Sequence, residues 1–476
     1  MAEPRVIIVG AGPAGVRCAQ ALVAAGLRPL VIDESRRDGG QIYRRQPDQF
    51  TRPYSKLYGT EAPRALDLHE SFERLRASID YQSETLAWNV AGGTLHTTHA
   101  GVASQHPFDA LVLCPGATDR LMPVKGWQRA GTYSLGASQI ALKAQACAIG
   151  SNVVFMGSGP LLYLVANQYV QAGATVAAVL DTSSFGKRLR ALPKLLARPD
   201  VLRKGAALVS SLRKQGVKIE TGIVPVEIHG DDQRGVDGVS YRTARGAQHR
   251  IACDAVALGY HLRPETQLAD LAGCTFTFDA STRQWLPQLD EMGRSSVKNV
   301  YLAGDGARVL GADGAETAGA LAAFAVLQDL GSAVDASRVA SLIRTREKMD
   351  RFRAGLAIAF PWPAQQAAAL SDDTIVCRCE GISAGELRRV VRDESAREAN
   401  RAKAFSRVGM GRCQGRYCGH AAAEVIASES GVPLEQVGRL RGQAPVKPFA
   451  ISTVSDTLAA TQVVAGHTAL TTLEEE

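Results

Sequence analysis

Four of the nine cysteines gather near the C-terminus, where their spacing could hold a metal centre. Cys377 and Cys379 flank one residue, whereas Cys413 and Cys418 flank four. Paired thiolates bind zinc ions or iron–sulfur clusters. The Cys-x-Cys pair differs from the Cys-x-x-Cys of common zinc ribbons, and glycines around the second pair free the backbone to approach inorganic sulfide. The quartet therefore favours a [2Fe–2S] cluster, with a structural zinc ion as the alternative.

The other five cysteines are scattered along the chain. They are Cys18, Cys114, Cys147, Cys253 and Cys274. Most of them lie in apolar segments, where a free cysteine acts as a small buried hydrophobe. An odd, scattered set is typical of a reducing compartment. We therefore expect buried thiols and a cytoplasmic protein.

A glycine turn near the N-terminus could hold a dinucleotide. Gly10 permits a tight bend, Gly12 lets backbone amides approach a pyrophosphate, and Gly15 lets a helix pack close to its strand. Asp33 follows a second apolar run, where its carboxylate can accept hydrogen bonds from an adenosine ribose. A glycine pair at 39–40 lets a loop fold back over a bound cofactor.

Gly304 and Asp305 form a further candidate, because they directly follow an expected strand at 297–303. An aspartate at the end of a strand can bond a sugar-alcohol chain. The amides of a new helix, expected from about Thr317, can meet the electron-rich edge of a ring. A structural aspartate that caps this helix is the alternative.

A second fingerprint, at 152–181, departs from the pattern. Gly157 and Gly159 follow an apolar strand, but Leu162 stands where the third glycine belongs. The helix must then lie further from the strand, and Asp181 comes one residue late for a ribose contact. We expect a retained fold whose nucleotide binding is doubtful.

Alternating strands and helices must position these groups, which predicts an α/β fold. In the first unit, strands at 6–9 and 29–32 flank a helix at 16–25. The other expected elements are a helix at 63–77, strands at 85–90, 94–98, 108–113, 153–156, 176–180 and 252–258, and a helix ending at 172. Residues 331–370 have the pattern of a connector.

The length of 476 residues predicts two to four domains. The 54 basic and 47 acidic residues are mostly interspersed, and a net charge of +7 is too mild to indicate nucleic-acid binding. No apolar run reaches the roughly 18 residues of a membrane-spanning helix. A core strand that begins at about residue 5 leaves no room for a signal peptide.

The segment 187–218 is strongly basic, with ten lysines or arginines and one acid, Asp200. Solvated helical faces are the simpler interpretation. A docking surface for a partner or an anionic substrate is the alternative.

The order of these motifs resembles a known family. The first fingerprint, the motif at 39–43 and the Gly304-Asp305 pair look like flavoproteins of glutathione reductase type, which have two Rossmann-like dinucleotide-binding domains. The quartet resembles the bacterioferritin-associated-ferredoxin type [2Fe–2S] domain. A flavoprotein followed by a cluster domain is similar to the larger subunit of opine oxidases, D-hydroxyproline dehydrogenase and hydrogen cyanide synthase. Motifs at 116–120, 157–160, 258–260 and 413–418 carry the same likeness.

The resemblance implies FAD in the first nucleotide site and a [2Fe–2S] cluster on the quartet. Some relatives carry NAD or ATP in that site, and related enzymes place FMN at a subunit interface. The candidate cofactor-binding residues are Gly10, Gly12, Pro13, Ala14, Gly15, Asp33, Glu34, Gly40, Gln41, Ile42, Gly116, Gly304, Asp305, Thr317 and Ala318. The reductases usually have a Cys-x4-Cys disulfide after the glycine pair. This chain has other residues there, which disfavours disulfide reduction.

The resemblance also implies a division of the chain. We expect an FAD-binding domain at 1–118 and 283–330, a second, NAD(P)-like domain at 119–282 and a connector at 331–371. A small helical [2Fe–2S] domain at 372–430 and a C-terminal tail at 431–476 complete the chain.

In this family the larger subunit does not oxidise the substrate, so no catalytic residue is expected. A partner that resembles glycine and D-amino-acid oxidases would take hydride from an amine carbon. This chain would pass the electrons to an external acceptor, and a small ferredoxin-like subunit is a further expected partner. Association with a membrane would come only through partners. The alternatives are a stand-alone NAD(P)H-dependent flavin reductase that uses 152–262, and a regulatory or assembly subunit with zinc.

Overall fold

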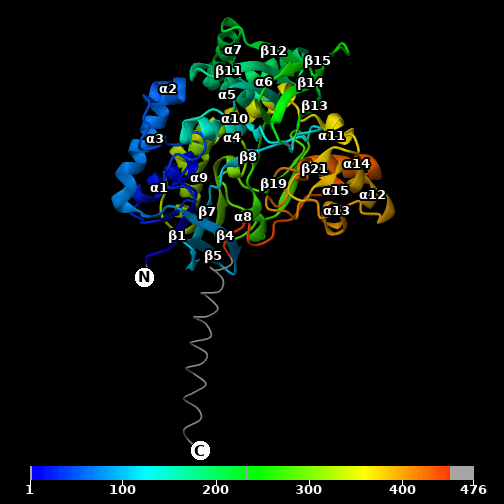
Figure 1. Cartoon of the computed structure of the whole chain (residues 1–476). Coiled ribbons are helices and arrows are strands. Elements are labelled where there is room, and N and C mark those ends of the chain that lie inside the picture. Colours follow the sequence, from blue (N-terminus) through cyan, green and yellow to red (C-terminus); the bar gives the residue numbers. More distant parts are fainter. Residues whose placement is uncertain (1–2, 232, 451–476) are drawn as a thin grey trace, which may run out of the picture.

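The computed structural model describes residues 3–231 and 233–450 (Figure 1). Its first sheet is parallel, in the order β20-β7-β1-β2-β3. These strands are β1 (Val6–Val9), β2 (Leu30–Ile32), β3 (Asp80–Gln82), β7 (Ala110–Leu113) and β20 (Val300–Leu302). β1 lies in the middle, and all residues of β1 and β7 are buried because the sheet is covered on both faces.

Helices α1 (Pro13–Ala24) and α9 (Gly311–Asp329) pack tightly together beside this sheet, with α3 (Ala62–Leu75) on the outer side of α1. A Cβ atom at Gly319 would lie 2.0 Å from the carbonyl oxygen of Ala14, so the close approach of α1 and α9 requires glycine there. α9 begins at Gly311, and the expected start at about Thr317 was wrong. Gly311 and Gly314 belong to its first turn.

The second sheet is also parallel, in the order β12-β11-β10-β16-β9. Its strands are β9 (Thr132–Ser134), β10 (Asn152–Ser158), β11 (Thr175–Asp181), β12 (Lys218–Thr221) and β16 (Ala255–Tyr260). The helices of this part are α4 (Leu135–Ala144), α5 (Pro160–Gln171), α6 (Phe185–Leu195) and α7 (Pro199–Lys214). The strand-turn-helix-strand order of the second fingerprint is therefore retained, as expected.

Small antiparallel sheets complete this two-sheet body. β4 (Thr85–Ala91), β5 (Thr94–His99) and β6 (Val102–Pro107) form one, and β13 (Val224–Asp231), β14 (Gly235–Arg242) and β15 (Gln248–Ala252) form another. β18 (Phe276–Asp279) pairs with β19 (Gln284–Pro287). Where the chain crosses between the two large sheets, β8 (Ala117–Asp119) pairs with β17 (Leu262–Pro264).

Residues 331–370 are more ordered than the expected connector. They contain α10 (Ala336–Ala359), a helix of 24 residues, and α11 (Ala364–Ala368). α10 packs against both α6 and α9, and so braces the second sheet against the first. Few of its residues are fully buried, which explains why no apolar stripe indicated it.

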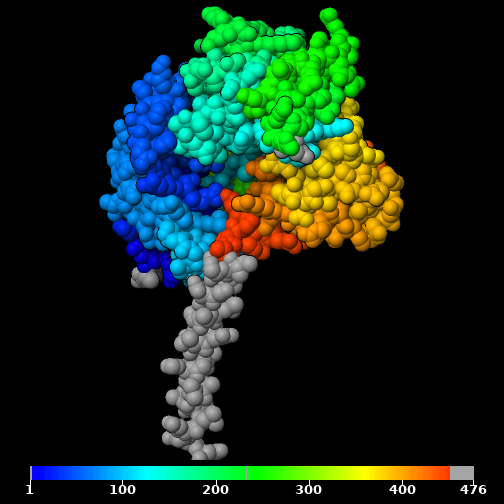
Figure 2. All heavy atoms as spheres, in the orientation of Figure 1, coloured from blue at the N-terminus to red at the C-terminus, as the bar shows by residue number. Residues whose placement is uncertain are grey.

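The C-terminal part has its own hydrophobic core. Its elements are β21 (Ile375–Cys377), β22 (Ile382–Ser383), α12 (Ala384–Asp393), α13 (Ala399–Ser406), α14 (Gly419–Ser430) and α15 (Leu434–Val437). Figure 2 shows the last described segment, in red, between this part and the N-terminal part of the molecule. Phe449 packs on Trp88 at a ring distance of 5.3 Å. Residues 451–476 of the expected tail lie outside the described residues.

Two further expectations concern burial and membranes. Cys18, Cys114, Cys253 and Cys274 are buried as expected, whereas Cys147 is exposed, so the prediction was wrong for that thiol. It follows the end of α4, where the chain is at the surface. No helix of the described residues combines the length and apolar character needed to cross a bilayer.

Candidate functional site

The first glycine turn is built so tightly that side chains are excluded from it. At Gly10, φ is +107°, and an added Cβ would lie 2.3 Å from the carbonyl oxygen of Cys114. A Cβ at Gly15 would lie 1.8 Å from the carbonyl oxygen of Gly10. The turn, the start of α1 and the end of β7 are thus held together by backbone contacts.

Gly12 and Gly40 face each other across this turn. A Cβ at Gly12 would lie 3.5 Å from the Cα atom of Gly40, and a Cβ at Gly40 would lie 3.0 Å from the Cα atom of Gly12. The amide of Gly39 donates to the carbonyl oxygen of Ala11 at 2.9 Å, which fixes the loop over the turn. The glycine pair thus forms a cradle with the start of α1, as expected. Pro13 and Ala14 begin that helix and are buried.

Asp33 braces the same turn. Its carboxyl accepts hydrogen bonds from the amides of Ala11 and Ser35, both at 2.6 Å. Burial raises its pKa, and these amides act in the opposite direction. Each carboxylate oxygen has a second lone pair, so the group keeps capacity for a ribose hydroxyl. The neighbouring Glu34 is exposed and forms an ion pair with Lys447, from the last described segment.

The loop after the glycine pair rests on a buried lysine that sequence reasoning missed. Gln41 is exposed, and the carbonyl oxygen of Ile42 accepts a hydrogen bond from Nζ of Lys143 at 2.9 Å. Burial and, to a smaller extent, the charge of Arg44 lower the pKa of Lys143 to about 8. Lys143 lies on α4, far along the chain, so no local pattern could indicate this contact.

Asp305 caps α9. One oxygen, Oδ1, accepts hydrogen bonds from the amides of Leu310 at 2.8 Å and Gly311 at 3.0 Å. Burial raises its pKa, and the two amides counteract that effect. Oδ1 of Asp305 therefore caps α9, which was the alternative interpretation of this residue. Gly304 has φ of +71°, and an added Cβ would lie 2.8 Å from the Cβ of Ala14. This contact places the Gly304-Asp305 turn against the start of α1.

Thr317 and Ala318 lie in the second turn of α9 and do not supply its free amides. Thr317 is buried, and its hydroxyl donates to the carbonyl oxygen of Asp313 at 2.9 Å. The expectation that helix-terminal amides lie at Thr317 was therefore wrong. Gly116, the remaining candidate, lies in the turn between β7 and β8, where its carbonyl oxygen accepts from the amide of Glu265 at 3.0 Å.

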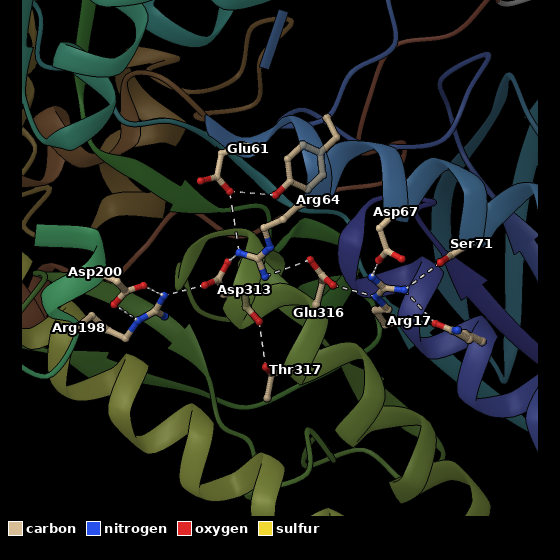
Figure 3. Close-up of polar contacts among 12 residues, drawn as sticks. Arg17, Glu61, Arg64, Asp67, Ser71, Arg198, Asp200, Asp313, Glu316 and Thr317 are labelled. Carbon is tan, nitrogen blue, oxygen red and sulfur yellow. Dashed lines mark hydrogen bonds and ion pairs between the residues drawn. The ribbon is translucent and has the colours of Figure 1, made fainter. Parts of the chain in front are cut away.

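The start of α9 carries an ion-pair network that no motif predicted (Figure 3). Asp313 binds Arg198 at 2.8 Å and also pairs with Arg64, while Glu316 binds Arg17 at 2.8 Å. Arg198 precedes α7, so the network links the part around the second sheet to α1, α3 and α9. A cavity of ≈390 Å³ borders it.

The basic segment 187–218 lies mainly in α6 and α7. Some of its basic side chains form ion pairs inside the molecule, and others are exposed. Arg188 and Arg198 are used inside the molecule, on Asp181 and Asp313. Lys187, Arg190 and Lys194 are exposed, as solvated helical faces require.

The second fingerprint has lost its free acid. Leu162 is fully buried against the strands. Asp181 is fully buried as well. Its carboxyl accepts hydrogen bonds from the hydroxyl of Tyr163 at 2.7 Å, from the amide of Ser183 at 2.7 Å and from Arg188 at 2.6 Å. These internal partners occupy the carboxylate that a ribose would need.

The four clustered cysteines come together as the spacing predicted. Cys377 ends β21, Cys418 precedes α14, and both are 1% exposed, whereas Cys413 is half-buried and Cys379 is exposed, so the centre lies at the edge of the small domain. Cys418 interacts with Cys377 and Cys413, and Cys413 also interacts with Cys379. The side chains thus form a continuous chain of four sulfurs.

Backbone amides point at the sulfurs of Cys377 and Cys413, whereas burial raises the pKa of Cys379 and the neighbouring thiols raise that of Cys418. Cys418 and then the amides of Gly409 and Glu380 lower the pKa of Cys377 to about 6, against its burial. Cys418 and the amides around Gly415 lower the pKa of Cys413 to about 5. Amides that stabilise thiolates are the environment that an anionic iron–sulfur cluster needs. No group of three or more metal-binding side chains in the described part of the chain converges on the position of a single ion.

Comparison with known proteins shows to which family the chain belongs. Residues 4–328 match the pyridine nucleotide-disulphide oxidoreductase family, and residues 375–428 match the BFD-like [2Fe-2S] binding domain. The chain belongs to the pyridine nucleotide-disulphide oxidoreductases. This match confirms the expected α/β class with a C-terminal cluster domain.

Three relatives align over 94% of the chain. The opine oxidase A subunits of Rhizobium meliloti and of Agrobacterium tumefaciens strain Ach5 are 37% and 36% identical, over 86% and 90% of their own lengths. HcnB, a subunit of hydrogen cyanide synthase from Pseudomonas protegens, is 28% identical over 96% of its length. These matches confirm the resemblance drawn from the motifs.

A solved structure shares the fold of this oxidoreductase. L-proline dehydrogenase from P. horikoshii superimposes with a TM-score of 0.66 over 94% of this chain and 79% of that chain, at 18% identity. The likeness therefore extends to the arrangement of both large sheets and the C-terminal part.

The family implies a flavin, and the BFD-like domain implies a [2Fe–2S] cluster. The residues fit both groups. Glycines stand wherever a Cβ would fill the space between α1 and the 39–40 loop, and the amides around the quartet suit anionic sulfur. The comparisons give no support for FMN.

Proposed function

We propose that the chain is the electron-transfer flavoprotein and iron–sulfur subunit of a hetero-oligomeric amino- or imino-acid dehydrogenase, of the opine, D-hydroxyproline or glycine type. The observation that carries this proposal is that a single chain joins a glycine cradle for a dinucleotide to a quartet of neighbouring thiols, two of them buried. The relatives are named as subunits of opine oxidase and of hydrogen cyanide synthase, which supports a role inside a larger assembly.

In this proposal, the first turn holds FAD. Gly10, Gly12 and Gly15 keep the backbone close enough for amides to meet the pyrophosphate, and Asp33 accepts from the ribose. Asp305 fixes the turn before α9 and occupies the amide of Gly311, so the amides at 312–314 would meet the flavin ring. FAD, rather than NAD or ATP, suits a chain that must accept electron pairs and release single electrons to a cluster.

Four thiolates hold the cluster in the C-terminal domain, which is proposed to span 372–430. The flavin domain comprises 1–118 and 283–330, and the second dinucleotide domain 119–282. The sheet composition supports this division, since β20 rejoins the first sheet after the second sheet is complete. The connector at 331–371 contains α10, which braces the two domains.

Substrate oxidation is assigned to a partner flavoprotein that resembles glycine and D-amino-acid oxidases, and a small ferredoxin-like protein is a further partner. The rival function, a stand-alone NAD(P)H-dependent reductase, would need the second fingerprint. The internal pairing of Asp181 with Tyr163 and Arg188 disfavours it.

One experiment separates these functions. The purified, flavin-loaded chain is mixed with NADH or NADPH in a stopped-flow instrument under anaerobic conditions, and the flavin absorbance is followed. We expect no rapid bleaching by either nucleotide, and bleaching by an amino acid only after the amine-oxidising partner is added. Rapid bleaching by NADH without a partner would establish the reductase instead.

A further inference from the structure

The loop between Cys413 and Cys418 carries a buried arginine that no motif assigned. The side chain of Arg416 is 8% exposed, and its guanidinium forms two hydrogen bonds to Glu265, at 2.7 and 3.2 Å. Its remaining nitrogen, Nη1, donates to the carbonyl oxygen of Val446 at 2.8 Å. The loop that supplies two cluster ligands is thus bonded to a residue of the two-sheet body.

Glu265 lies beside the first nucleotide site. It directly follows β17, which pairs with β8, and its amide donates to the carbonyl oxygen of Gly116 at 3.0 Å. Neighbouring contacts hold the same junction, since Gln267 donates to the carbonyl oxygen of Gln414 at 3.0 Å and Arg263 to that of Arg416 at 3.1 Å. The segment 263–267 therefore touches the turn at Gly116 on one side and the cysteine loop on the other.

The charge of Glu265 depends on its burial and on the two arginines beside it. Burial alone would raise the pKa of Glu265, but Arg416 and Arg263 outweigh it and the pKa is lowered. The carboxylate is therefore ionised. The guanidinium of Arg263 also interacts with Cys413 and Cys418. Because desolvation cancels much of the attraction within a buried ion pair, such a pair is a poor source of stability and a better device for fixing geometry.

We propose that the Arg416–Glu265 pair positions the cysteine loop against the Gly116 turn and sets the reduction potential of the cluster. This inference rests on the proposed electron-transfer function. A cation beside an anionic cluster favours the added electron and raises the potential, whereas a carboxylate lowers it. Arg416 and Glu265 are positioning residues and act on the cluster through its loop and through their charge.

The test uses the full-length protein loaded with both cofactors and three variants. Glu265→Gln removes the negative charge, Arg416→Gln removes the positive charge, and Glu424→Gln is the matched control. Glu424 is also a buried carboxylate at this junction, bonded to Arg283 at 2.8 and 2.7 Å, but it lies on α14 beyond the cysteine loop. The midpoint potential of the cluster is measured by EPR-monitored redox titration, and docking by hydrogen exchange of peptides that cover 262–267 and 413–418.

We expect the potential to rise in Glu265→Gln and to fall in Arg416→Gln, with a markedly smaller shift in Glu424→Gln. Faster exchange in both peptides is expected for the first two variants. A purely structural role would move both potentials in the same direction, and equal or absent shifts would overturn the inference. If Arg416→Gln fails to fold, the comparison of Glu265→Gln with Glu424→Gln decides. A wild-type protein without iron would instead refute the proposed function itself.

Discussion

The hydroxyl of Tyr163 and the carboxylate of Asp181 are joined by a hydrogen bond of 2.7 Å at the point where the second fingerprint should offer a free acid. Tyr163 follows Leu162, the residue that replaces the third glycine of that fingerprint. Leu162 thus fills the contact between helix and strand, and the next residue, Tyr163, donates its phenol hydroxyl to Asp181. The two halves of the flavoprotein have the same architecture, but only the first keeps its glycine cradle open.

The cluster assignment predicts two iron atoms per chain and a loss of both on substitution of one ligand. Cys413→Ser should abolish the visible cluster absorbance and the EPR signal of the reduced protein while flavin remains bound. The exposed Cys147 offers a matched control, since Cys147→Ser should leave iron content unchanged. Stoichiometric zinc and no iron after anaerobic purification would contradict the assignment.

The cradle predicts that side chains at its glycines expel the flavin. Gly12→Val should project into the space between Gly12 and Gly40, so releasable FAD should fall to a small fraction of the wild-type amount. Gly205→Ala is the control, because a Cβ at Gly205 in α7 would meet nothing within 4 Å. Flavin content is measured by absorbance after denaturation. Full FAD retention in Gly12→Val would place the nucleotide elsewhere.

Asp305 should have two separable roles. Asp305→Ala removes the cap of α9 and should lower the free energy of unfolding by about 0.5–2 kcal/mol. Asp305→Asn can still accept from the amides of Leu310 and Gly311, so it should recover most of that stability. Thermal unfolding of the flavin-free protein measures the contribution of Asp305 to the stability of α9. The dissociation constant of FAD measures its contribution to FAD binding. Equal stability of both variants would argue against capping.

His69 predicts a pH dependence of stability. Its ring bonds the carbonyl oxygen of Tyr43 and the hydroxyl of Tyr54, both at 2.8 Å, and burial lowers its pKa from 6.5 to about 4. The folded protein therefore binds this proton less readily than the unfolded chain. The stabilisation is complete above pH 6.5 and is lost as the pH falls towards 4. It should amount to a few kcal/mol, on the order of 1.4 kcal/mol for each pH unit.

The measurement is chemical denaturation of wild type and His69→Gln between pH 7 and pH 4. The variant should show a flatter dependence of the unfolding free energy on pH. Because His69 holds the segment after Gly39 and Gly40, we also expect the wild type to release flavin more readily at the acidic end. Parallel pH profiles for the two proteins would show that His69 does not titrate in this range.

Local patterns predicted the parts of the fold whose causes are local. The apolar run of β1, the glycine turn and the second strand lie where expected, and the spacing of Cys377, Cys379, Cys413 and Cys418 predicted a common centre. Such features depend on backbone sterics and on short sequence distances.

The sequence predictions failed where contacts between distant parts of the chain determine the structure. α9 starts at Gly311 because Asp305 supplies its cap, although glycines normally disfavour a helix. α10 has a weak apolar stripe and depends on α6 and α9 for its packing. Lys143 and Arg416 reach the candidate site from distant segments, so no spacing within the sequence could indicate their contacts.

The ion pair between Glu34 and Lys447 has a consequence for the order in which the protein is made. Glu34 leaves the ribosome long before Lys447, which follows the whole cluster domain. The first part of the nucleotide cradle, which Gly304, Asp305 and α9 complete later, is thus synthesised long before the segment that carries Lys447. A chain released before residue 447 would have both cofactor-binding parts and the contacts between 263–267 and 414–416, but not this ion pair.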